Sequence, residues 1–79
     1  MKFKSVNEVF DEIRKAKQIP IEIQKVLTKR QNEMLEMNLI GGLTWYAIAK
    51  KLGRSISYPY GERRQIYFRI LESLVGGVA

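Results

Sequence analysis

The stretch from Leu27 to Arg54 contains two successive helix starts, and each of the two helix patterns ends at glycine. In the second pattern Ala49 lies four residues before Gly53. An Ala on the inner face of a short helix lets another helix cross it closely, and Gly can adopt the positive φ of a tight turn. Two helices joined at a steep angle by such a turn form a helix-turn-helix unit. We therefore expect an all-α fold built around this unit.

A further helix is predicted near the start of the chain. Ser5 and Glu8 have the spacing of a capping box, in which each side chain bonds the backbone amide of the other residue. Apolar residues then recur at helical spacing over residues 6–17, with acidic residues in the first turn and basic residues in the last. This charge distribution suits the helix dipole, so we expect an amphipathic helix here.

The next segment, about residues 20–27, is open to two interpretations. Pro20 fits the first position of a helix. The alternating isoleucines at positions 19, 21 and 23 are equally typical of a short strand. Because no other part of the sequence offers an obvious partner strand, we favour a short helix.

The first helix of the central stretch is expected between Thr28 and the Gly41-Gly42 pair. Thr28 and Gln31 fit a second capping box. Met34 lies on the apolar face that continues from Gln31. It is expected to fill the core rather than to form a protein-binding surface.

Thr44 is expected to cap a helix that ends at Gly53, with an apolar side made of Trp45, Ile48, Ala49 and Leu52. The last long helix is expected to begin near Pro59, because Pro is tolerated in the first turn and disfavours helical geometry in the residue before it. Its inner stripe is expected to consist of Tyr67, Ile70, Leu71 and Leu74. Together these patterns predict a four- to five-helix single domain over residues 1–79.

Composition excludes several classes of protein. The chain has 79 residues, and a domain of this size buries only about 60% of the surface of its unfolded chain. It contains no Cys and no His, which excludes disulfides, thiolate metal clusters, zinc fingers and His-based catalysis. No run approaches the roughly 18 apolar residues of a membrane span, and no signal peptide is recognisable. We expect a cytoplasmic protein of a bacterium or an infected host, without a cofactor.

Basic residues are concentrated in the second half of the chain. Residues 1–43 contain eight basic and six acidic residues, whereas residues 44–79 contain six basic and two acidic ones. Over fifteen consecutive positions only Glu62 accompanies five basic residues, Lys50, Lys51, Arg54, Arg63 and Arg64. We expect a polyanion to meet this half of the chain first.

The stretch 27–53 resembles the C-terminal DNA-binding domain of bacterial sigma factors, known as region 4, and the related domain of response regulators. These families share a Leu-Thr/Pro-x-Arg-Gln/Glu opening, a long helix, a Gly-Leu-Thr/Ser joint and an Ile-Ala-x-x-Leu-Gly close. The matching residues are Leu27, Thr28, Arg30, Gln31, Gly42, Leu43, Thr44, Ile48, Ala49, Leu52 and Gly53. The resemblance implies a transcription regulator of bacterial or phage type that binds double-stranded DNA, with a helix-turn-helix core over residues 28–75.

The sequence departs from the family's pattern after Gly53. The family's second helix would begin at about residue 56, but this chain has Pro59 and Gly61 shortly afterwards. A Pro one turn into a helix costs about 3 kcal/mol. We therefore expect an extended turn over residues 54–58, with Ile56 as its buried apolar plug, before a helix from Pro59.

Residues around this turn are the candidate DNA contacts. Phosphates are expected to be bound by the amide end of the helix that follows Thr44 and by three cations, Lys50, Lys51 and Arg54. Base readout is expected from Arg63, Arg64 and Gln65, since Arg suits guanine and Gln suits adenine in the major groove. Further contacts to phosphates or sugars are expected from Ser55, Ser57, Tyr58 and Tyr60. The alternative is that these polar residues are the solvated face of a small helical protein.

Aromatic and acidic patterns give weaker signals. The aromatic residues suggest base stacking on single strands, but Trp45 and Tyr67 lie on apolar stripes and are expected in the core. Glu33 and Glu36, like the acidic cluster of the first helix, have a spacing that can hold a metal in principle. Because no His or Cys completes such a site, we expect neither a metal site nor an enzyme.

Two further functions stay open. The chain could be a helical adaptor that binds a protein such as RNA polymerase, as a phage-encoded modulator would, or the DNA-recognition domain of a phage packaging subunit. A single module of this size covers only a modest DNA surface. We therefore also expect a homodimer or a second protein, with a dimer contact around Leu74, Val75 and Val78. Groove binding should weaken steeply with salt, whereas an adaptor should bind little DNA even at low salt.

Overall fold

The computed structural model describes residues 3–76, and within them the chain forms five α-helices and no strand. The helices are α1 (Val6–Ala16), α2 (Ile21–Gln24), α3 (Lys29–Leu35), α4 (Trp45–Leu52) and α5 (Ser57–Gly76). A π-helical turn, η1 (Glu36–Ile40), continues α3. The predicted all-α fold is therefore confirmed. The helix predicted for residues 20–27 is present but shorter, because only the four residues of α2 are helical.

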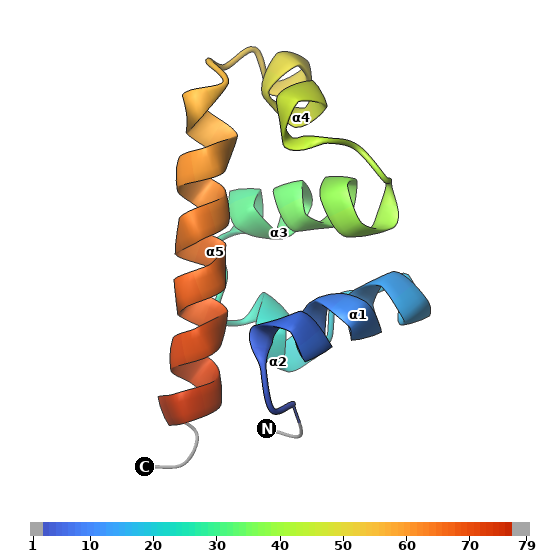
Figure 1. Cartoon of the computed structure of the whole chain (residues 1–79), viewed down its shortest axis with the longest axis vertical. Coiled ribbons are helices and arrows are strands. Elements are labelled where there is room, and N and C mark those ends of the chain that lie inside the picture. The colour runs from blue at the N-terminus through green and yellow to red at the C-terminus, as the bar shows by residue number, and fades with distance from the viewer. Residues whose placement is uncertain (1–2, 77–79) are drawn as a thin grey trace.

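The long helix α5 runs along the longest dimension of the molecule, which measures 39 × 23 × 18 Å (Figure 1). Its 20 residues correspond to about 30 Å of helix. Three helices, α1, α3 and α4, lie at successive heights along one side of α5, with α4 beside its start (Figure 1). Each of the three contacts α5. The opposite side of α5 is not covered by any other described element (Figure 1).

The core joins the N-terminal helices to the C-terminal part of α5. One continuous cluster of buried side chains consists of Phe3, Val6, Val9, Ile13, Ile19, Ile23, Leu27, Leu35, Ile66 and Ile70. Three predicted core residues, Met34, Ile48 and Ala49, are also buried. Trp45 is half-buried against the main cluster. Fully burying an aliphatic side chain contributes about 1.5–3 kcal/mol, so burial of this cluster strongly favours folding.

Local side-chain bonds fix the predicted helix starts. The hydroxyl of Thr28 accepts a hydrogen bond from the Gln31 amide at 3.1 Å, and the Gln31 side chain accepts one from the Thr28 amide at 3.0 Å. Gln31 is 3% exposed whereas Thr28 is exposed, so this capping box is partly buried. Thr44 caps α4 in the same manner by accepting from the Ala47 amide at 3.1 Å. Both caps confirm the expectation from sequence.

The capping box predicted for α1 forms in only one direction. The hydroxyl of Ser5 accepts from the Glu8 amide at 3.2 Å. The Glu8 carboxylate does not return this bond to Ser5, because it accepts from the Lys4 amide at 3.2 Å instead. At its other end α1 is closed by Lys17, which has a left-handed conformation with φ of 55°.

Two glycines make the corner between η1 and α4 for different reasons. The Gly41 amide donates to the Glu36 carbonyl at 2.9 Å, five residues back, which is the π-helical pattern. A Cβ at position 41 would lie 2.8 Å from the carbonyl oxygen of Met37. Gly42 has open space around it but a φ of +73°. The Leu43 amide then donates to the same Met37 carbonyl at 3.0 Å, so that the corner has little freedom to move.

The start of α5 differs from the prediction. The sequence predicts a helix from Pro59, whereas α5 begins at Ser57 and only residues 53–56 separate it from α4. Pro59 is the third residue of α5, where its missing amide would have no partner within the helix. The carbonyl that its ring would clash with belongs to Ser55, which lies outside the helix. Ile56, predicted as a buried plug of the turn, is 43% exposed.

The inner stripe of α5 is also different from the predicted one. Tyr67 and Leu71 were the expected core residues, but they are 42% and 37% exposed. Ile66 and Ile70 are fully buried in their place, and Leu74 is half-buried against them. The C-terminal part of α5 has apolar residues on both sides, so periodicity alone does not decide which side meets α1 and α3. The prediction was therefore correct for Ile70 and wrong for Tyr67 and Leu71.

Candidate nucleic-acid interface

The corner between α4 and α5 has the geometry that the Ala49 and Gly53 spacing predicts. Gly53 has a φ of +66° and ends α4 in the left-handed conformation. The Arg54 amide donates to the Ala49 carbonyl at 3.0 Å, and the Gly53 amide to the Lys50 carbonyl at 3.2 Å. Ala49 itself is 2% exposed. The corner thus sets the last turn of α4 beside the first turns of α5 (Figure 1).

This corner gathers cations at one end of the molecule. We define the basic end as five exposed residues of α4, the turn and α5, namely Lys50, Lys51, Arg54, Arg63 and Arg64. None of them forms an ion pair within the described residues, whose two ion pairs are Arg14 with Asp11 and Arg30 with Glu33. Glu62, the only acidic residue in the same stretch, is half-buried. The acidic residues of α1 lie toward the opposite end of α5 (Figure 1).

Two aromatic rings hold cations of the basic end in place. The guanidinium of Arg54 lies 4.6 Å from the centre of the Tyr58 ring. The ammonium of Lys50 lies 5.5 Å from the centre of the Tyr46 ring. Such contacts contribute about 0.5–1 kcal/mol at exposed sites and reduce the freedom of the cation. Tyr46 was not among the predicted site residues, although its position four residues before Lys50 on a helix is a signal for the contact.

The predicted polar contacts of the turn are accessible to different degrees. Ser55 and Ser57 are exposed, and their hydroxyl oxygens lie 3.0 Å apart in a hydrogen bond. Tyr60 is exposed, whereas Tyr58 is half-buried beneath Arg54. The hydroxyl of the exposed Thr44 already accepts the capping bond of α4.

The three residues predicted to read bases do not face the same way. Arg63, Arg64 and Gln65 are all exposed, but successive residues on a helix point about 100° apart. Arg64 precedes the buried Ile66 by two residues and therefore lies opposite the buried side of α5. Arg63 and Gln65 flank it on either side. A groove that receives the outer side of α5 would face Arg64 directly, with Gln65 near one wall. Arg63 precedes the buried Ile66 and Ile70 by three and seven residues, so it lies on their stripe of α5 and not on the outer side.

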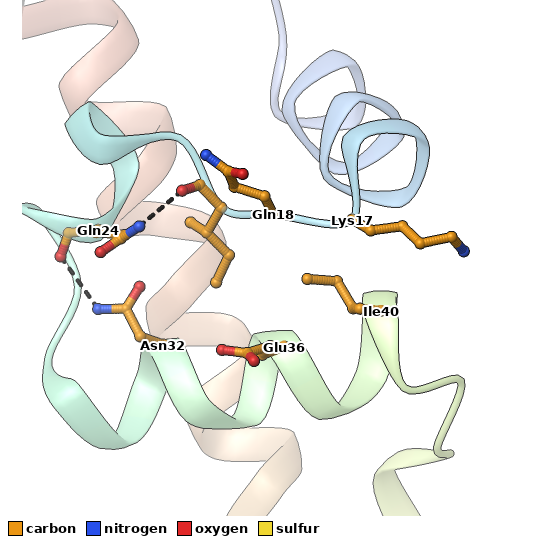
Figure 2. Close-up of a pocket in the computed structure, with 7 residues that line it drawn as sticks. Lys17, Gln18, Gln24, Asn32, Glu36 and Ile40 are labelled. Atoms are coloured by element: carbon orange, nitrogen blue, oxygen red, sulfur yellow. Dashed lines mark hydrogen bonds between the residues drawn. The ribbon is translucent and has the colours of Figure 1, made fainter.

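A separate pocket of about 260 Å³ lies between the end of α1, α2 and α3 (Figure 2). The Gln24 side chain donates to the Ile19 carbonyl at 2.7 Å, and the Asn32 side chain donates to the Gln24 carbonyl at 3.1 Å. Figure 2 shows that the Lys17 side chain points away from both amides. The pocket lies outside the basic end. Its amide groups join Ile19, which precedes α2, to Gln24 at the end of α2, and join Gln24 in turn to Asn32 of α3.

Within residues 3–76, no helix is long and apolar enough to cross a membrane. In the same part of the chain, no three acidic side chains lie close enough together to hold a metal ion. No protein-family model, curated protein or solved structure matches the chain.

Proposed function

We propose that the chain is a sequence-specific DNA-binding protein, a transcription regulator of bacterial or phage type, that works in the cytoplasm. The supporting observation is the basic end: five exposed cations without an ion-pair partner lie along the last turn of α4, the turn and the first two turns of α5, with a single half-buried carboxylate among them. Phosphate contacts of this kind supply most of the affinity of proteins for DNA. The charges of the remaining surface are mixed, so the corner is where the field of the protein favours a polyanion.

In this proposal the outer side of the first two turns of α5 enters the major groove. Ser57, Gly61 and Arg64 recur at helical spacing on that side, and the small residues at 57 and 61 let the helix backbone approach the bases. Arg64 then bonds guanine as a bidentate donor. Lys50, Lys51 and Arg54 bind the phosphates on one wall of the groove, with Arg54 positioned by the Tyr58 ring.

The test is a titration of duplex DNA at several salt concentrations, followed by fluorescence anisotropy. Binding through three to five cations should give a slope of roughly −3 to −4.5 in a plot of log affinity against log salt. Lys51→Ala should reduce the steepness of that slope by about one. Lys25→Ala, which removes an exposed cation at the end of α2, is the matched control and should leave the slope unchanged.

Comparison of a selected DNA site with random DNA distinguishes base contacts from phosphate contacts. Arg64→Ala should lower the preference for the selected site over random DNA, by about 1–3 kcal/mol. Lys50→Ala should weaken binding to both by the same factor. If the wild-type protein binds no duplex even at low salt, the DNA-binding proposal is wrong. The adaptor function, in which the same scaffold binds a protein, then becomes the better explanation.

A further inference from the structure

The side of α5 that faces away from the other helices is apolar over most of its length. Its large exposed apolar residues recur three, four or seven positions apart, and they are Tyr60 (49% exposed), Tyr67 (42%), Phe68 (55%), Leu71 (37%) and Val75 (65%). We call these five residues the outer face of α5. The rings of Tyr67 and Phe68 meet edge to face, with their centres 5.9 Å apart and their planes at 89°. The outer face is thus a continuous apolar row from Tyr67 to Val75 with an aromatic pair at one end, and Gly61 and Arg64 separate this row from Tyr60.

A helix that is apolar on both sides is normally covered on both sides. The buried side of α5, with Pro59, Ile66 and Ile70, is covered by the other helices. Its outer face exposes on the order of 450 Å² of side chain, which reaches the size of the largest patches on small monomeric proteins. Patches of this size usually mark a contact surface.

We propose that the outer face binds a second copy of this chain, with the two α5 helices antiparallel and the twofold axis near Phe68. Arg64 lies four residues before Phe68, and Glu72 lies four residues after it. Both are exposed and neither has an ion-pair partner within the described residues. An antiparallel pair centred on Phe68 sets Arg64 of each copy beside Glu72 of the other. A parallel pair would set Arg64 against Arg64 and Glu72 against Glu72, which is unfavourable.

Gly61 provides a second argument for this register. A Gly inside a helix costs about 0.5–1 kcal/mol relative to Ala. Nothing in the described chain requires it, because a Cβ at position 61 would have no neighbour within 4 Å. Gly61 lies seven residues before Phe68, and Val75 lies seven residues after it. The antiparallel pair therefore places the missing side chain of Gly61 opposite the protruding Val75 of the other copy.

The area is sufficient for a specific dimer. Together with the stems of Arg64, Gln65 and Glu72, the outer face would cover roughly 600–700 Å² on each copy, or about 1,300 Å² in total. This exceeds the roughly 1,000 Å² that separates specific interfaces from chance contacts. The arrangement is isologous, so it closes with two copies and does not form chains.

The test is the oligomeric state of the full chain, measured by sedimentation equilibrium from low-micromolar to millimolar concentration, without DNA. The wild-type protein should reach twice its monomer mass of 9.2 kDa. Phe68→Glu should weaken association at least about tenfold, because it places two like charges at the axis. Ile21→Glu is the matched control: Ile21 is 61% exposed on α2, outside the outer face, and its replacement should not change association.

A charge exchange tests the antiparallel register. Arg64→Glu and Glu72→Arg should each weaken the dimer about tenfold, and the double variant should return to within about threefold of the wild type, because the pair is restored with its signs reversed. Gly61→Leu should also weaken the dimer while leaving the monomer folded, as followed by circular dichroism. A monomeric wild-type protein at millimolar concentration, an unaffected Phe68→Glu variant, or a double variant no better than the single ones would each overturn the proposal. All these measurements are independent of DNA binding.

Discussion

Replacement of Gly41, Gly42 and Gly61 by Ala, one at a time, should lower the free energy of unfolding strongly at position 41, lower it less at position 42, and raise it at position 61. At position 41 the new Cβ would lie 2.8 Å from the Met37 carbonyl oxygen, which is fixed by the hydrogen bond from the Leu43 amide. The backbone must shift, so we expect a loss of about 2 kcal/mol, within the range measured for overpacked sites.

At Gly42 the space is open and only the positive φ of +73° opposes a side chain. The left-handed conformation costs about 1–2 kcal/mol for an Ala. Ala restricts the unfolded chain more than Gly does, which offsets about 0.4–1 kcal/mol of this cost. The expected net loss is about 1 kcal/mol. At Gly61, inside α5 and without neighbours, the same change should stabilise the monomer by about 0.5–1 kcal/mol.

The assay is thermal and urea unfolding followed by circular dichroism at 222 nm, the usual helix signal, with all three changes made in the Phe68→Glu background. This background removes the proposed self-association, so that only the monomer is compared. For a domain of this size, 1 kcal/mol shifts the midpoint by about 4–8 °C. A Gly41→Ala protein as stable as its parent, or a Gly61→Ala protein less stable than its parent, would refute the reasoning from the local geometry.

Three further outcomes are expected. Thr28→Ala should cost about 1 kcal/mol and more than Ser5→Ala, because the Thr28 box is reciprocal and partly buried whereas the Ser5 cap is one-sided and exposed; equal losses in urea unfolding would contradict this. Lys17→Gly should raise the unfolding midpoint by a few degrees, since Lys17 has a φ of 55°; a lower midpoint would argue against strain there. Arg54→Lys should weaken DNA binding although the charge is kept, because Lys loses the planar stacking on Tyr58; unchanged affinity at constant salt would show that the ring does not position the cation.

The helix boundaries set by neighbouring residues were predictable from sequence. The caps at Thr28 and Thr44 and the left-handed turn at Gly53 each depend on bonds between residues three to five positions apart. Such bonds are local, so the spacing of residue types is sufficient to place them. The assignment of the five cations to α4, the turn and the first half of α5 also depends only on residues that are close in sequence.

The orientation of α5 was not predictable in the same way. Ile66 and Tyr67 are both apolar and adjacent, and the choice between them depends on where α1 and α3 lie. The sequence predicts a later start of α5 because it assigns Pro59 the cost of a Pro inside a helix. At the third position of a helix the backbone amide has no partner within the helix, so Pro removes no hydrogen bond there. The predicted dimer contact stays a prediction: of its residues Leu74 is half-buried, Val75 is exposed, and Val78 lies outside the described residues. The role of the basic end in DNA binding stays a prediction.

Arg64 lies in the same row along α5 as Phe68, between the turn and the C-terminal apolar residues. In the proposed complex with DNA it is the central base contact, and in the proposed dimer it pairs with Glu72. One side chain cannot do both, so occupancy of an operator and self-association would compete for a common surface. As the cellular amount of the protein rose, a growing fraction would be in the paired form, and the amount free to bind an operator would increase less than in proportion to synthesis.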